Sequence, residues 1–492
     1  MSKASKPMSN NNQKTACIIG GGMSGLFTGA LLAKNGYKVT VLEKNHIIGG
    51  GLQSFRRGDA VFNTGVEVFT CYDERFILRD LIHYLNLEEK SFQPISIDEE
   101  AMETVWVGKN CYKLPQGREK YEEYLTSNFP KEKAGIHNLL DCIFEIGYSF
   151  DYIWANNAKR HTELHKYIGL TGEQLIRKFI KDKNLIAIFN YLSLHLRGNL
   201  SVISAFDFGM IATIYIEGGW RFSGPCSLFV NEIEKCILNH NGKVLNSTQV
   251  NKIYTNNGSV LKIEAINGKT FSADLYIGAI APSLILQMSD TVIFRKATIE
   301  RIETFNNDCS MSNIYIILKE NKIPFLNSMI FVPLNKKDEM LPNVIAIYTP
   351  RNKHQGKYAT TLGISIPTRY SEFSKWKNTL TGNRGEDYIE YKNNFAVNIL
   401  NYVFTFFPIL KDAISSFIVS TPLTIQDYYG NPNGAVFGQQ GLFLPIKTKL
   451  DNLYMTGQAI QYPGLAGIAV TSIMTAETIL GRSLIEEIAA AK

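Results

Sequence analysis

Cysteines are few and scattered in this chain, and long apolar runs are absent. Among 492 residues there are seven cysteines, an odd number that forms no Cys-x-x-Cys pair, at positions 17, 71, 111, 142, 226, 236 and 309. This pattern excludes a disulfide framework and indicates reduced thiols, with no spacing typical of a zinc or other metal site. We therefore expect a cytoplasmic protein that binds no metal.

No segment supplies the roughly 20 consecutive apolar residues that a membrane-spanning helix needs. The nearest stretches, residues 275–288 and 402–410, are too short or are interrupted by Pro282 and Pro408. Residues 1–15 are polar and lack the apolar core of a secretory signal, so we expect a disordered tail there. Any contact with the cytoplasmic membrane would be peripheral.

Neither sign of charge is in large excess. The 51 Lys and Arg residues against 45 Asp and Glu residues give a formal charge of +6, and no dense basic run occurs. Nucleic acid is therefore not an expected partner, whereas a weak attraction to an anionic membrane surface remains open. With 45% hydrophobic residues the chain can bury a large core, and its length predicts two or three domains. These features leave the oligomeric state open.

A glycine-rich turn lies between two short apolar runs near the start of the chain. Apolar residues 16–19 precede Gly20-Gly21-Gly22-Met23-Ser24-Gly25, helical spacing follows, and a second apolar run covers residues 38–42. This order predicts a βαβ unit whose glycine turn and helix start bind a pyrophosphate, while Glu43 accepts hydrogen bonds from ribose hydroxyls. The alternative is a glycine turn of purely structural use. We expect dinucleotide contacts from Gly20, Gly22, Met23, Ser24, Gly25, Glu43 and Lys44.

A second glycine segment indicates which dinucleotide is bound, namely FAD. Gly49-Gly50-Gly51 and Leu52 follow soon after Glu43. An NAD-binding unit does not need a second glycine turn at this place, whereas the diphosphate and ribityl chain of a flavin would gain another backbone surface. Taken alone, the triplet fits an ordinary surface loop equally well. Beside the first motif, it predicts FAD contacts from Gly50, Gly51 and Leu52.

The C-terminal section supplies a third motif. Residues 452–455 have a strand pattern, and a helical pattern begins after Pro463. This order would place a helix N-terminus beside the isoalloxazine ring, where its partial positive charge stabilises negative charge. A buried structural helix is the alternative. We expect flavin contacts from Gly457, Gln458, Gly464, Leu465 and Ala466, and a backbone contact from Val250 to the adenine.

Strand and helix patterns alternate along the rest of the chain. Residues 80–215 have a largely helical pattern, and the dipeptides Asn257-Gly258 and Asn267-Gly268 predict tight hairpins. We predict an α/β fold with a discontinuous Rossmann-type FAD-binding domain and a mixed α+β substrate domain. The first comprises residues 16–80, 218–289 and 425–492, and the second comprises residues 81–217 and 290–424.

Taken together, the motifs resemble the phytoene desaturase, carotenoid isomerase and retinol saturase group of flavoproteins, a branch of the amine-oxidase-like superfamily. The resemblance covers most of the chain. It rests on residues 20–25 with Glu43, Gly49-Gly50 leading to Phe55 and Thr64-Gly65, Glu217-Gly218-Gly219, and Leu453-Tyr454 through Gly457-Gln458 to Gly464 and Gly467. Within this group, three segments are most similar to the retinol saturases and carotenoid isomerases. They are residues 421–424, Tyr428 or Tyr429, and Asn433-Gly434-Ala435-Val436-Phe437-Gly438.

The resemblance implies non-covalently bound FAD and a long apolar polyene as substrate, with saturation, desaturation or isomerisation of a carbon–carbon double bond. Two segments depart from the pattern of the group. Asn63-Thr64-Gly65-Val66-Glu67 stands where relatives often have Asp-Thr-Gly followed by a histidine, and Glu217-Gly218-Gly219 continues into Trp220-Arg221. Both departures are expected where the substrate meets the flavin.

Reduction of a double bond also needs a proton donor or a group that stabilises developing charge. Glu67 is the first candidate, and a tyrosine, Tyr428 or its neighbour Tyr429, is the second. A solvated or ion-paired carboxylate is the structural alternative for Glu67. His195 could line a substrate chamber, although a single histidine among leucines is more often a core residue.

Two other functions share this architecture. A flavin amine oxidase would be favoured by a flavin-linking cysteine near the C-terminus, but no cysteine follows Cys309. A non-enzymatic isoprenoid carrier need not keep the phosphate-binding glycines together with the ribose-binding acid, and this chain has both. No second complete dinucleotide motif occurs, so NAD(P)H would act as an external electron donor.

Overall fold

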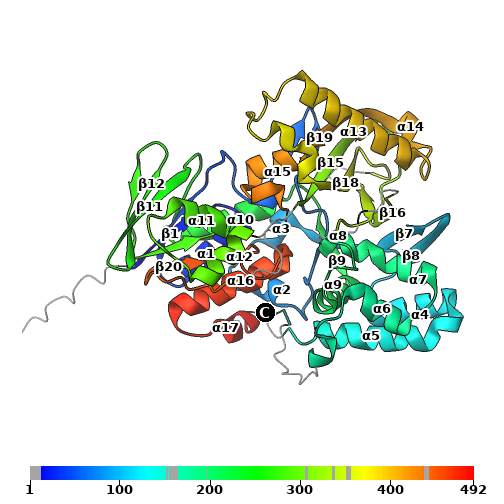
Figure 1. Cartoon of the computed structure of the whole chain (residues 1–492), viewed down its shortest axis with the longest axis horizontal. Coiled ribbons are helices and arrows are strands. Elements are labelled where there is room, and N and C mark those ends of the chain that lie inside the picture. The colour runs from blue at the N-terminus through cyan, green and yellow to red at the C-terminus, as the bar shows by residue number, and fades with distance from the viewer. Residues whose placement is uncertain are drawn as a thin grey trace, which may run out of the picture.

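The structure is a computed structural model, shown in Figure 1. It describes residues 13–150, 153–154, 164–196, 198–304, 308–334, 338, 340–350, 356–436 and 443–491. Most of the expected disordered tail, residues 1–12, lies outside the described residues, as do Phe437 and Gly438. The first strand, β1, begins at Thr15, one residue earlier than expected.

A five-stranded parallel sheet collects strands from three distant parts of the chain. Its order is β10-β2-β1-β14-β20, and every neighbouring pair is parallel. The strands are β10 (Lys243–Leu245), β2 (Lys38–Leu42), β1 (Thr15–Ile19), β14 (Leu275–Gly278) and β20 (Leu453–Met455). The carboxyl ends of β1, β14 and β20 therefore meet at one edge, where ligands bind in open α/β sheets.

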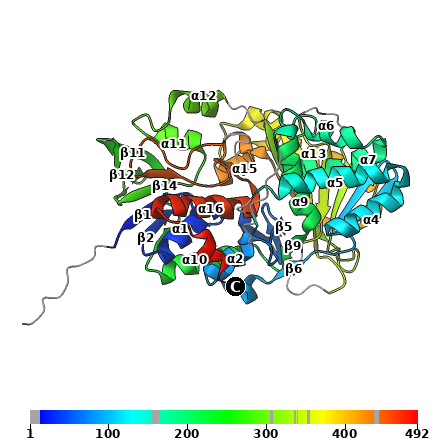
Figure 2. The same ribbon diagram turned by 90° about the horizontal axis from the view of Figure 1, so that it is seen from below.

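Helix α1 (Met23–Lys34) is buried on nearly all sides between this sheet and two further helices. It carries no charge before Lys34, as expected for a helix that is apolar all round. It packs against α10 (Ser227–Asn239) and α16 (Gly464–Leu480), as Figure 2 shows. A Cβ on Gly29 would lie 3.2 Å from Ile18 and 3.3 Å from Ile237, so glycine permits this close packing.

The predicted hairpins are confirmed on one side of this sheet. Strands β11 (Val250–Asn256), β12 (Ser259–Ala265) and β13 (Thr270–Phe271) form an antiparallel sheet. Asn257 and Gly258 both have positive φ, at 48° and 80°, which is the geometry of the tight hairpin turn that an Asn-Gly pair favours.

A seven-stranded sheet forms the centre of the other half of the molecule. Its order is β19-β15-β18-β17-β16-β7-β8. The strands are β19 (Ile414–Ser420), β15 (Cys309–Leu318), β18 (Thr361–Arg369), β17 (Val344–Tyr348), β16 (Met329–Pro333), β7 (Glu103–Val107) and β8 (Asn110–Leu114). One face packs on α13 (Glu386–Phe404) through a core that includes Ile314, Ile364 and Leu400.

The opposite face of this sheet is covered by helices, and in Figure 1 these lie below it. They include α4 (Arg118–Asn128), α5 (Lys133–Gly147), α6 (Gly172–Phe179), α7 (Lys183–Ile188), α8 (Ser193–Leu196) and α9 (Ala205–Glu217). The remaining helices are α2 (Ile77–Tyr84), α3 (Glu89–Phe92), α11 (Pro282–Met288), α12 (Lys296–Thr304), α14 (Leu410–Ala413), α15 (Pro422–Tyr429) and α17 (Ile485–Ala489).

The expectation of a largely helical segment over residues 80–215 is partly wrong. The segment contains β7 and β8, which form a hairpin around Gly108, a residue with φ of 60°. Strand β7 also pairs in parallel with β16, for example Glu103 with Met329. Because this partner lies more than 200 residues away, local periodicity could not indicate the pairing.

A small three-stranded sheet joins the two halves. It has the order β5-β9-β6, with β5 (Phe69–Thr70), β9 (Gly219–Phe222) and β6 (Pro94–Ser96). Phe69 pairs with Trp220 and Thr70 with Gly219. This pairing brings the two segments that depart from the family pattern next to each other. The hairpin of β3 (Ser54–Arg57) and β4 (Ala60–Asn63) precedes it in the chain.

Helices α5 and α9 cross at a very short distance, and two glycines permit the contact. A Cβ on Gly147 would lie 2.2 Å from Oγ1 of Thr213, and one on Gly209 would lie 2.8 Å from Cβ of Ile146. The Thr213 hydroxyl donates to the Ile143 carbonyl at 2.9 Å. These contacts fix α9, one wall of the cavity described below.

We predict that Gly147→Val lowers the free energy of unfolding by about 1–3 kcal/mol, because the added methyl groups force α5 and α9 apart. The same change at Gly356, where a Cβ meets no described residue within 4 Å, should have little effect. Denaturant unfolding followed by circular dichroism measures both. Equal stability of the two variants would contradict the close crossing.

Candidate active site

Two continuous cavities lie at the carboxyl edge of the parallel sheet. The first, called the groove, is lined by the three glycine-rich segments. The second, called the chamber, lies between the groove and the seven-stranded sheet. They share six lining residues, Gly65, Val66, Tyr429, Val436, Gly464 and Leu465. A molecule that lies in the groove can therefore contact another in the chamber.

Most of the predicted flavin-binding residues line these cavities. Ten line the groove, namely Gly22, Met23, Ser24, Gly50, Gly51, Leu52, Gly457, Gln458, Gly464 and Leu465. Ala466 lines the chamber. Strand β20, the turn after it and the start of α16 position the C-terminal members of this set. The structure thus brings together residues that are more than 400 positions apart in the chain.

The first glycine turn is tight, and its free surface faces the groove. Gly20 has φ of 109°, and a Cβ on Gly25 would lie 2.0 Å from the Gly20 carbonyl oxygen. A Cβ on Gly22 would meet no atom of the described residues within 4 Å. The glycines at 20 and 25 therefore shape the turn, while Gly22 leaves backbone accessible to a ligand.

Glu43 fixes this turn through hydrogen bonds. Its carboxylate accepts the Gly21 N–H and the Asn45 N–H, both at 2.8 Å. Burial raises the pKa of Glu43, and these hydrogen bonds oppose the shift. Sequence reasoning missed Gly21, whose Cβ would lie 2.8 Å from that of Glu43. Both carboxylate oxygens keep capacity for a further donor, because each can accept more than one hydrogen bond.

Two predicted contacts lie farther from the groove lining. Val250 is buried at 3% exposure on β11 and pairs with Ala265. The Lys44 ammonium donates to the Asp427 carbonyl at 2.5 Å and links the end of β2 to α15. Burial lowers the Lys44 pKa. The flavin contacts of both residues remain predictions.

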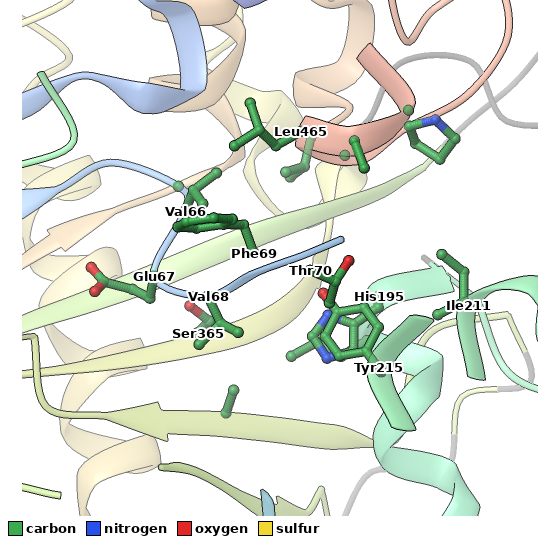
Figure 3. Close-up of a pocket in the computed structure, with 18 of the residues that line it drawn as sticks. Val66, Glu67, Val68, Phe69, Thr70, His195, Ile211, Tyr215, Ser365 and Leu465 are labelled. Atoms are coloured by element: carbon green, nitrogen blue, oxygen red, sulfur yellow. The ribbon is translucent and has the colours of Figure 1, made fainter. Parts of the chain in front are cut away.

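The chamber is lined mainly by apolar side chains from four parts of the chain. One wall is the segment of residues 64–70, and another is formed by α8 and α9. The seven-stranded sheet forms the third wall, and the start of α16 closes the fourth, next to the groove. Among the described residues that line the chamber there is no lysine or arginine. Figure 3 shows part of these walls.

Glu67 lies in the chamber wall, and its environment favours the neutral acid. Burial raises the pKa of Glu67 to about 8, while the Arg221 guanidinium and a hydrogen bond with Asn63 partly oppose the shift. Arg221 is 2% exposed and donates to the Thr349 carbonyl at 2.8 Å. The two departures from the family pattern therefore lie close enough for Arg221 to act electrostatically on Glu67, which the sequence did not reveal.

Of the two candidate tyrosines, Tyr428 and Tyr429, the structure favours Tyr429. Tyr428 is 39% exposed and lines neither cavity, whereas its neighbour Tyr429 lines both. The Tyr429 hydroxyl donates to the Thr64 carbonyl at 3.4 Å, and burial raises its pKa to about 12. Successive residues of a helix point about 100° apart, so only one of the two can face the chamber.

His195 lines the chamber rather than a closed core. In Figure 3 it lies on the opposite side of the labelled group from Glu67. Its ring stacks on that of Tyr215, with centroids 3.8 Å apart and planes inclined by 25°. Burial lowers the pKa of His195 to about 3, so the imidazole is neutral at physiological pH. Sequence reasoning missed Tyr215, since nothing in the sequence places it beside His195.

Among the described residues, no group of three or more His, Cys, Asp or Glu side chains is arranged to hold a metal ion. No helix within the described ranges has both the length and the apolar character needed to cross a bilayer.

The first comparison with known proteins concerns the N-terminal segments that line the groove. Residues 18–85 match the family model described as an NAD(P)-binding Rossmann-like domain. The matched range contains the end of β1, all of α1 and β2, and the second glycine segment. The predicted Rossmann-type dinucleotide-binding unit is therefore confirmed.

The solved structure of putrescine oxidase bound to putrescine has the same fold. It superposes with a TM-score of 0.62 at 15% identity, covering 96% of this chain and 99% of that one. At this identity the likeness concerns the fold alone. It confirms the expected amine-oxidase-like architecture.

The chain is also similar in sequence to enzymes named for retinoid and carotenoid substrates. All-trans-retinol 13,14-reductase of Danio rerio is 24% identical, over 95% of this chain and 86% of the relative. Prolycopene isomerase 1, chloroplastic, of Oncidium hybrid cultivar is 23% identical over 53% of this chain and 47% of the relative. The resemblance drawn from the motifs is confirmed, and this chain is an oxidoreductase similar to the retinol saturases and carotenoid isomerases.

Proposed function

We propose that the protein is a FAD-dependent oxidoreductase that acts on carbon–carbon double bonds of a long apolar polyene of carotenoid or retinoid type. The observation that carries this proposal is the continuity of the groove with the chamber at Gly464 and Leu465. A dinucleotide in the groove would present its far end to an apolar substrate. The similarity to retinol saturases and carotenoid isomerases supports the same substrate class.

The residues of the groove fit non-covalently bound FAD. Gly22 and the second glycine segment offer backbone to the diphosphate. Glu43 directly follows β2, the place of the ribose-binding acid in a Rossmann unit. Gly464 and Leu465 begin a 17-residue helix whose N-terminus faces both cavities. A bound flavin would supply hydride exchange with a carbon of the double bond.

The chamber holds the substrate and keeps water away from it. Its walls are formed largely by Val, Ile, Leu, Met and Phe side chains, which suit a hydrocarbon chain. Electrons would come from an external donor such as NAD(P)H. A substrate this apolar would enter from a membrane, so we propose that the protein is in peripheral contact with one. We place the protein in the cytoplasm.

We propose that Glu67 is the group that exchanges a proton with the carbon–carbon double bond of the substrate. With a pKa of about 8 it is protonated near neutral pH, as a general acid must be. Arg221 keeps this pKa from rising further, so that the carboxylate formed after proton transfer is stabilised. Tyr429, held by the Thr64 carbonyl, lies at the junction of groove and chamber and orients the same segment.

We predict that the purified protein shows the absorption bands of oxidised FAD. After anaerobic reduction with dithionite, all-trans-retinol or a carotenoid should restore these bands while the polyene absorption shifts to shorter wavelength, if the reaction is a saturation. A polyene that changes geometry without net flavin oxidation indicates isomerisation, and one whose absorption shifts to longer wavelength with oxidised flavin indicates desaturation. Absence of flavin would refute the proposal, and so would a flavin that is reduced by amines but reacts with no polyene.

We predict that Glu67→Gln slows the reaction with the polyene by about 10²–10⁴-fold, because the amide cannot donate a proton in the same way. In the wild type the rate should fall as the pH rises through about 8, the pKa of Glu67. The variant should lack this fall. The pH dependence of kcat/KM measures both. An unchanged rate in Glu67→Gln with bound flavin would remove Glu67 from the mechanism.

The raised pKa of Glu67 also predicts a pH dependence of stability. The group binds its proton more tightly in the folded state, with a pKa of about 8, than at its ordinary value of 4.5. Its contribution is therefore fully present below about pH 4.5 and is lost as the pH rises toward 8. Glu67→Gln should remove this loss, which unfolding at a series of pH values would show. Parallel curves for the two proteins would contradict the raised pKa.

A further inference from the structure

The wall of the chamber opposite Glu67 contains polar groups that the proposed reaction does not use. His195 on α8 and Tyr215 on α9 both line the chamber and stack on each other. The His195 Nε2 atom is buried and forms no hydrogen bond with any described residue. A buried polar atom without a partner is rare in native structures and calls for a ligand or another explanation.

The electrostatic surroundings of this wall favour neutral groups. Burial keeps the His195 imidazole uncharged, so that one ring nitrogen donates and the other accepts. Glu103 lies nearby, is 2% exposed, and neither of its carboxyl oxygens has a hydrogen-bond partner among the described residues. Burial raises the Glu103 pKa well above its usual value, which favours the neutral carboxyl here too.

Strand register places Glu103 beside the chamber. Glu103 pairs with Met329, and Met329 pairs with Tyr348 on the next strand. Side chains of paired residues point to the same face of a sheet, and both Met329 and Tyr348 line the chamber. A negative charge brought to this wall would meet a carboxyl that already resists ionisation, and no lysine or arginine occurs among the described lining residues.

We propose that His195 and Tyr215 bind an uncharged oxygen group, a hydroxyl or a carbonyl, at one end of the substrate. This inference rests on the proposed function and narrows it to oxygenated polyenes. A hydrocarbon end would leave the His195 nitrogen without a partner, and a carboxylate end would lose its hydration at a wall where no described lining residue is a lysine or arginine. Sites built to hydrogen-bond a substrate oxygen discriminate strongly against analogues that lack it.

The test compares the binding of three probes that differ only at one end. These are all-trans-retinol, the corresponding hydrocarbon without the hydroxyl, and all-trans-retinoic acid. Quenching of tryptophan fluorescence in the flavin-loaded protein gives each Kd without turnover. We expect retinol to bind about 10- to 100-fold more tightly than the hydrocarbon, the range expected for one satisfied buried group. Retinoic acid should bind more weakly than retinol.

Variants assign this preference to the two residues. His195→Leu should make the Kd values of retinol and the hydrocarbon equal. His195→Gln keeps a donor and an acceptor, so it should restore part of the preference for retinol. Tyr215→Phe should lower the ratio and covers the case in which His195→Leu fails to fold. Met210→Leu, another chamber residue, is the matched control and should leave the ratio unchanged.

The outcomes separate this inference from the proposed function. Equal binding of retinol and hydrocarbon by the wild type, a ratio that survives in His195→Leu, or tightest binding of retinoic acid would each overturn the inference while leaving a polyene chamber in place. Failure of the wild type to bind any of the three probes would overturn the proposed polyene substrate and the inference with it.

Discussion

The pairing of β1 with β14, and of β14 with β20, is the constraint on which the site depends. These pairs bring the chain at residues 19, 278 and 455 to one edge of a sheet. Hydrogen bonds extend the ladder beyond the strands, with Ala279 N–H donating to Ile19 at 2.9 Å and Thr456 N–H donating to Gly278 at 3.0 Å. Without this alignment the glycine-rich segments would not face a common groove.

Three carboxyl groups, Glu43 and Glu103 in the interior and Glu67 at the chamber wall, show how the protein adjusts one chemical group to different uses. Glu43 is buried, but backbone N–H groups compensate it and limit its pKa shift. Glu67 has a guanidinium nearby, and its pKa rises to about 8. Glu103 has no hydrogen-bond partner among the described residues, and burial raises its pKa well above the usual value. The difference follows from what stabilises the ionised form in each place.

The polar groups of the chamber lie on different sides of it. In Figure 3 Glu67 lies on one side of the labelled residues, and His195 and Tyr215 lie on the other. The remaining lining side chains are mainly apolar. A substrate that is apolar along its length and polar at one end would match this arrangement in one orientation, which decides the bond presented to the groove.

The sequence by itself determined the Rossmann unit, because spacing of glycines, apolar runs and one acidic residue is a local property. It also indicated the hairpin at Asn257-Gly258, since backbone geometry there follows from the residue types. The β7–β8 hairpin was missed, because its strand character depends on pairing with β16. Only the tertiary structure shows that Tyr429, and not Tyr428, lines the chamber. It also shows that Arg221 lies near Glu67 and that Tyr215 stacks on His195. Such contacts join residues distant in sequence, and their directions depend on how the packed elements are oriented.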